Sequence, residues 1–62
     1  MEPRLKYLRE DNGYTQKQLA EYLLCDEAAY SKFETGERIL PLEDAVKLAD
    51  LYNVSVDYIV GR

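Results

Sequence analysis

Side chains between positions 26 and 32 have the chemistry needed to read double-stranded DNA. Lys32 can donate to O6 and N7 of guanine or to a phosphate, and Glu27 can accept from N4 of cytosine. Ala28 offers a methyl contact to thymine, and the Ser31 hydroxyl suits bases or backbone. Asp26 is better suited to cap a helix than to meet phosphates. These groups act together only if one helix exposes them on one face.

The residues before this segment predict a short helix that begins after Thr15. Gln18 follows Thr15 at the spacing of a capping box, in which each residue bonds the backbone N–H of the other. Tyr14 and Leu19 flank the box as a hydrophobic staple. We therefore expect a helix from Gln16 to about Leu24, with its apolar face toward the core.

A second short helix is predicted after a tight turn. Asp26 is an N-cap candidate, Tyr30 continues an apolar face, and Gly36 stands where a left-handed residue ends a helix. The helix should run from about Glu27 to Thr35. The unit over about residues 15–36 is therefore a helix-turn-helix, and its second helix is of the kind that enters a DNA major groove.

Three further helices are predicted around this unit. We expect them over Pro3–Asn12, from about Pro41 to Tyr52, and over Val56–Val60. The second of these carries an apolar stripe made by Leu42, Ala45, Leu48, Ala49 and Tyr52. The sequence thus predicts an all-α fold, with five helices in a compact orthogonal bundle and a single domain over residues 1–62.

The composition argues against several classes of function. The chain has 62 residues, one cysteine and no histidine, so an internal disulfide is impossible and a zinc site lacks ligands. An enzyme would need a general base and a substrate cleft, and this inventory offers little of either. No apolar run approaches the ~18 residues of a membrane helix, and the first residues lack an apolar signal core. We expect a cytoplasmic protein with no catalytic residues, cofactor, metal or membrane contact.

Three residues with reactive or polar groups are assigned to packing. Cys25 falls in the predicted turn and should fill a small buried space, whereas a redox sensor would need an exposed thiol. Tyr30 and Tyr52 occupy predicted core positions, where their hydroxyls need partners or access to solvent.

The residue pattern is more specific than a helix pair. The run Thr15-Gln16, Leu19-Ala20-Glu21, Tyr30-Ser31-Lys32-Phe33-Glu34 and Gly36 resembles the phage-repressor and Cro family of helix-turn-helix regulators, also called XRE-like. The resemblance continues on both sides of the unit, at Leu5, Leu8-Arg9, Pro41-Leu42, Leu48-Ala49 and Val54-Ser55-Val56-Asp57-Tyr58. It covers nearly the whole chain and implies a compact five-helix, lambda-repressor-like DNA-binding domain.

The resemblance also implies roles for individual residues. Arg9 should pair with Glu34, which would tie the first helix to the third, and Gln16 should contact a phosphate. The loop that carries Arg38 should follow the DNA backbone. Lys17 and Thr35 are weaker phosphate candidates. The full expected DNA-binding set is Gln16, Lys17, Asp26, Glu27, Ala28, Ser31, Lys32, Thr35 and Arg38.

Charge and turn chemistry depart from this pattern. The net charge is −4, whereas affinity for phosphates comes mostly from lysine and arginine. The predicted reading helix begins with two acidic residues, Asp26 and Glu27. Leu24 stands where a glycine is usual, and left-handed geometry costs a leucine about 1 kcal/mol.

Surplus apolar residues near the C-terminus predict self-association. Val46, Leu51 and Tyr58 are left over once the core is assigned, which suggests a two-fold dimer through the last two helices. We therefore expect a sequence-specific transcriptional regulator, by resemblance a repressor, that binds a palindromic operator as a homodimer. The alternative is a protein-interaction module that kept the fold and lost strong DNA affinity.

Overall fold

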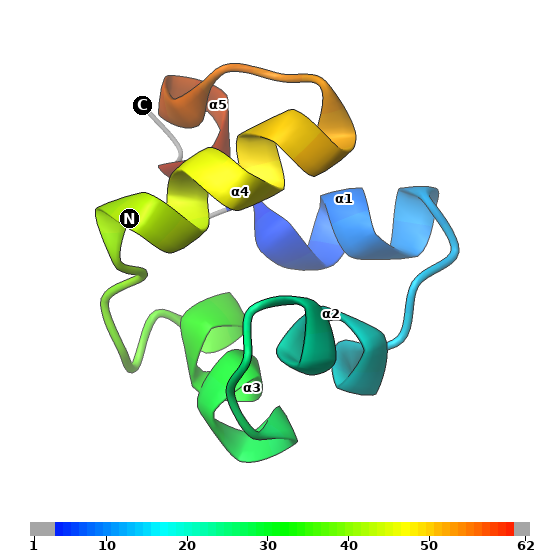
Figure 1. The fold of residues 1–62 in the computed structure, drawn as a ribbon, viewed down its shortest axis with the longest axis vertical. Helices are drawn as coiled ribbons and strands as arrows, with labels where there is room; N and C mark the ends of the chain where they lie inside the picture. Colours follow the sequence, from blue (N-terminus) through cyan, green and yellow to red (C-terminus); the bar gives the residue numbers. More distant parts are fainter. Residues whose placement is uncertain (1–3, 61–62) are drawn as a thin grey trace.

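A computed structural model describes residues 4–60, and within this range it contains helices and no strand (Figure 1). The helices are α1 (Leu5–Asp11), α2 (Gln16–Tyr22), α3 (Glu27–Thr35), α4 (Leu42–Tyr52) and α5 (Val56–Val60). The predicted all-α class is confirmed. The expected start of the first helix at Pro3 lies outside the described residues.

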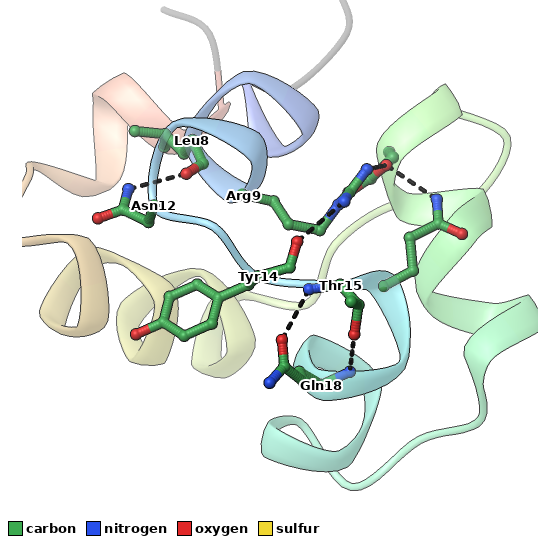
Figure 2. A network of polar contacts seen from close by, with 8 residues as sticks. Leu8, Arg9, Asn12, Tyr14, Thr15 and Gln18 are labelled. Atoms are coloured by element: carbon green, nitrogen blue, oxygen red, sulfur yellow. Dashed lines mark hydrogen bonds and ion pairs between the residues drawn. The ribbon is translucent and has the colours of Figure 1, made fainter.

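The helices of the helix-turn-helix unit begin at the predicted caps. The Thr15 hydroxyl accepts from the N–H of Gln18 at 3.1 Å, and the Gln18 side-chain oxygen accepts from the N–H of Thr15 at 2.8 Å (Figure 2). At α3 the Asp26 carboxylate accepts from the N–H of Ala29 at 2.7 Å. The C-cap of α3 is Gly36, in the left-handed region at φ 83°. Local hydrogen bonds therefore set these boundaries.

Three helices end in the same Schellman arrangement. A left-handed residue reverses the chain, and the next N–H returns to a carbonyl of the last turn. The left-handed residues are Gly13 after α1, Leu24 after α2 and Asn53 after α4. At α2 the Cys25 N–H donates to the carbonyl of Ala20 at 2.9 Å. This reversal ends α2 at Tyr22, before the end that we expected near Leu24.

The core draws buried side chains from all five helices. In Figure 1, α2 packs against α3 in the lower half of the view and α4 against α5 in the upper half, while α1 lies between the two pairs and contacts α3. The buried apolar residues are Leu5, Leu8, Leu19, Ala20, Leu23, Tyr30, Phe33, Ala45, Leu48, Ala49, Tyr52 and Ile59. This core fixes the side of α2 and α3 that remains exposed.

Two details of the core differ from expectation. Leu42, which we placed in the apolar stripe of α4, is 73% exposed, whereas Ala45, Leu48, Ala49 and Tyr52 of the same stripe are buried. Tyr30 and Tyr52 are buried as expected, but their hydroxyls have no hydrogen-bond partner among the described residues. Burial raises the pKa of both hydroxyls, that of Tyr52 to about 12.

Candidate nucleic-acid interface

A buried ion pair fixes α3 relative to α1. The Nε of Arg9 lies 2.6 Å from Oε2 of Glu34, and the Nη2 of Arg9 donates to Oε1 at 3.3 Å. The side chains are 12% and 4% exposed. Arg9 also donates through Nη1 to the carbonyl of Tyr14 at 3.1 Å, which holds the chain just before α2 (Figure 2). One guanidinium thereby positions both helices of the helix-turn-helix unit.

The charge of Glu34 is stabilised although its carboxylate is buried. Burial alone would raise the pKa of Glu34, but hydrogen bonds from Arg9 and Gln16 lower it below the ordinary value. The bond to Glu34 in turn raises the pKa of Arg9. Both groups therefore stay charged at neutral pH and compensate one another.

Gln16 is tied to this pair. Its Nε2 donates to Oε1 of Glu34 at 3.0 Å, and the residue is half-buried at the first position of α2. The sequence had suggested a surface residue free to meet a phosphate. We name these three side chains the Arg9–Glu34–Gln16 network, and it joins α1, α2 and α3.

The outer face of α3 presents three of the expected reading residues. Glu27, Ala28 and Lys32 are exposed. Ser31 is half-buried rather than exposed. Asp26 is exposed, but its carboxylate is used as the cap of α3.

The remaining candidates surround α3. Lys17 on α2 and Arg38 in the loop after α3 are exposed. The Thr35 hydroxyl is exposed but serves the end of α3, since it donates to the carbonyl of Lys32 at 3.2 Å and accepts from the N–H of Glu37 at 3.4 Å. Thr35 is therefore less available to a phosphate than Lys17 or Arg38.

The exposed charges of the unit are nearly balanced. Between positions 15 and 38 the exposed basic residues are Lys17, Lys32 and Arg38, and the exposed acidic residues are Glu21, Asp26, Glu27 and Glu37. Glu34 does not add to the acidic side because Arg9 compensates it. Three positive charges against four negative ones give this surface no net attraction for phosphates, so any phosphate contact would depend on the placement of single cations.

The expected dimer residues fall into two groups. Val46 is 45% exposed, whereas Leu51 and Tyr58 are half-buried and pack against the core. The Arg4 guanidinium also covers the Tyr58 ring at 4.6 Å from its centroid. Two further apolar residues, Ile39 and Leu42, are 90% and 73% exposed, although neither was expected at the dimer interface. For Ile39, the apolar Ile39-Leu40 step before Pro41 was the available signal.

The described residues give little support to a redox cysteine, a metal site or a membrane span. Cys25 is half-buried against the core, and burial together with the nearby charges of Asp44 and Asp26 raises its pKa. A raised pKa keeps the thiol protonated and unreactive, which argues against a redox sensor. Across residues 4–60, no three His, Cys, Asp or Glu side chains are grouped to hold a metal ion. None of the described helices is long and apolar enough to cross a membrane.

This fold and network define a helix-turn-helix protein, and residues 5–59 match the family model described as helix-turn-helix. The chain belongs to that family, which confirms the resemblance noted in its sequence. It is 42% identical over 59 residues to the HTH-type transcriptional regulator ImmR of Bacillus subtilis, covering 95% of this chain and 46% of ImmR. It is 36% identical over 59 residues to the cryptic phage CTXphi transcriptional repressor RstR of Vibrio cholerae, covering 95% of this chain and 53% of RstR.

A third relative is the uncharacterized HTH-type transcriptional regulator YobD of Bacillus subtilis, which is 43% identical over 58 residues, 94% of this chain and 52% of that protein. The chain thus spans about half the length of the curated relatives it matches. The similarity therefore concerns the helix-turn-helix part of those proteins.

Proposed function

We propose that this chain is a sequence-specific DNA-binding transcriptional regulator that places α3 in the major groove. The observation that carries the proposal is the two-sided character of α3. Tyr30, Phe33 and Glu34 are buried against the other helices, while Glu27 and Lys32 face solvent at the end of a fixed helix pair. A rigid helix with an exposed polar face is what readout of base edges requires.

The matched relatives support this proposal. Their names identify a transcriptional regulator in ImmR and a phage repressor in RstR, and neither is named as an enzyme. We infer repression as the sign of regulation and the cytoplasm as the place of action. Lys17 and Arg38 would contact phosphates, and Lys32, with Glu27 and Ala28, would read bases.

We further propose a homodimer on a palindromic operator. Single-domain readers of this kind gain affinity when two copies bind half-sites about 34 Å apart. Exposed apolar surface supports association, and Leu42 and Val46 lie one turn apart on α4. Leu51 and Tyr58 should contribute less because they already pack against the core. Sedimentation equilibrium would show a dimer for the wild type and a shift toward monomer for Val46→Lys.

The charge balance favours one competing function. Three exposed basic residues against four acidic ones suit a basic protein partner as well as DNA. In that case α3 would be an acidic docking helix that starts with Asp26 and Glu27.

Selection from a randomised duplex pool separates the two functions. We would select at about 50 mM and about 200 mM salt, because phosphate contacts weaken steeply over this range. Enrichment of a two-fold symmetric site, weakened by Lys32→Ala, is the result expected for a regulator. Lys6→Ala on α1 is the matched control, since Lys6 is exposed outside the helix-turn-helix unit. If no sequence is enriched even at low salt, the protein-interaction module is the better account.

A further inference from the structure

The two glutamines of α2 are held by opposite ends of their amide groups. Gln18 accepts through its oxygen from the backbone of Thr15, whereas Gln16 donates through its nitrogen to Glu34. An ionised carboxylate can only accept hydrogen bonds. Glu34 therefore selects the NH₂ end of Gln16 and disfavours the flipped amide, whose oxygen would face the carboxylate.

This orientation leaves a defined donor on Gln16. A side-chain amide has two N–H groups, and the bond to Glu34 uses one of them. DNA phosphates present acceptors only, so a flipped amide would offer them the wrong group. We propose that Glu34 is a positioning residue, which holds the Gln16 amide so that its second N–H can donate to a DNA phosphate. This inference rests on the proposed DNA-binding function.

The positive charge of Arg9 allows the Glu34 carboxylate to lie near a DNA phosphate. An uncompensated carboxylate beside the DNA backbone would repel it. The bidentate contact of Arg9, at 2.6 and 3.3 Å, neutralises Glu34 and keeps it in place. Arg9 therefore completes the arrangement from α1, without a contact to DNA of its own.

A double-mutant cycle on DNA affinity tests the proposal. In the wild type, Gln16→Ala should weaken binding about tenfold, the usual effect of losing a hydrogen bond to a charged group. In a Glu34→Gln background the side chain at position 34 can either accept from or donate to the Gln16 amide, so that amide loses its single preferred orientation. Gln16→Ala should then cost about twofold or less. Lys17→Ala is the control, because it should weaken DNA binding by the same factor in the wild-type and Glu34→Gln backgrounds. All variants would be compared at a temperature where circular dichroism shows them folded.

The control identifies a merely structural role. If Glu34→Gln only loosens the fold, it should alter the effects of Gln16→Ala and Lys17→Ala alike. If the wild type binds DNA but the losses of affinity in Gln16→Ala and Glu34→Gln simply add in the double variant, the positioning role is overturned while the proposed function stands. Failure of the wild type to bind any duplex would overturn the proposed function, and the positioning role with it.

Nuclear magnetic resonance of the wild-type protein gives a readout that needs no variant and no DNA. One side-chain amide proton of Gln16 should exchange with solvent more slowly than those of Gln18, whose NH₂ group donates to none of residues 4–60. Equal exchange at the two glutamines would overturn the orientation on which the proposal depends.

Discussion

The Nε of Arg9 and Oε2 of Glu34 lie 2.6 Å apart and join residues that are 25 positions apart in the chain. Oppositely charged groups in an apolar setting are stabilising only while both are present. In this protein the pair determines how α1 meets α3, and through Gln16 it also reaches α2. The stability of the helix-turn-helix unit and the presentation of its outer face therefore depend on one carboxylate.

Removal of the Arg9 guanidinium should strongly destabilise the fold. Arg9→Ala leaves the Glu34 carboxylate buried without its guanidinium, and we expect the free energy of unfolding to fall by roughly 3 kcal/mol. Urea denaturation followed by circular dichroism measures this change. Lys6→Ala, on the exposed side of the same helix, should change it by less than about 0.5 kcal/mol. Similar losses for both variants would mean that the pair is solvated rather than buried.

Acid should weaken the fold partly through Glu34. Its pKa is lower in the folded state than the ordinary value of 4.5, so the unfolded chain takes up the proton first as the pH falls. The contribution of Glu34 is complete above the ordinary value and is lost as the pH drops through the folded pKa. Wild type should exceed Glu34→Gln in stability at neutral pH, and the difference should shrink as the pH falls below the ordinary value of 4.5. A constant difference across this range would contradict the expectation.

Replacement of the left-handed turn residue Leu24 by glycine should stabilise the fold. Leu24 has φ 60° and is 86% exposed, so its side chain adds backbone strain and contributes little packing. Leu24→Gly should raise the free energy of unfolding by about 0.5–1 kcal/mol, as measured by thermal or urea denaturation. Asn53→Gly is the matched control at φ 56°, and it should gain less because asparagine tolerates this conformation. A loss of stability at Leu24→Gly would contradict this expectation, because it would mean that the packing of the leucine side chain outweighs its backbone strain.

The buried hydroxyl of Tyr52 should be dispensable for stability. Tyr52→Phe removes an oxygen that has no partner among the described residues, and we expect stability to rise by about 1 kcal/mol. Tyr22→Phe is the opposite case, because the Tyr22 hydroxyl donates to the carbonyl of Lys47 at 3.2 Å. That variant should lose about 0.5–1 kcal/mol. Calorimetry on both variants would compare them directly, and a loss at Tyr52→Phe would reveal a partner for its hydroxyl.

Salt dependence should be shallow for a DNA-binding protein. With two cationic phosphate contacts per copy, from Lys17 and Arg38, affinity should fall roughly tenfold per copy between about 50 mM and 200 mM salt. Fluorescence anisotropy with a selected duplex measures the slope. Arg38→Ala should reduce the slope by about one unit, whereas Glu37→Ala should leave it nearly unchanged. A slope near zero would favour the protein-interaction alternative.

The features of the fold that depend on local chemistry could be predicted from the sequence, whereas those that depend on tertiary packing could not. The Thr15–Gln18 capping box and the Asp26 cap are complete within a few residues, so the sequence alone locates the starts of α2 and α3. Leu42 is apolar and correctly spaced for the buried stripe of α4, yet it is 73% exposed, which helical spacing alone could not indicate. The half-burial of Leu51 likewise depends on the core that it packs against.

The candidate site shows the same division. That Lys32 is exposed follows from helical periodicity around the buried Tyr30. The contact of Gln16 with Glu34 joins residues 18 positions apart and was not visible in sequence spacing. Residue type therefore suggested which groups are candidates for contact with DNA, and the three-dimensional contacts suggest how one of them is oriented.

The shared endings of α1, α2 and α4 also bear on how fast this chain reaches its native state. Each ending is made by hydrogen bonds between residues at most five positions apart, such as Cys25 to Ala20 and Val54 to Ala49. Each helix can therefore start and stop before it meets its neighbours, and few long loops must close during folding. Topologies dominated by such short-range contacts fold on the microsecond-to-millisecond timescale, which leaves little time for partly folded chains to aggregate.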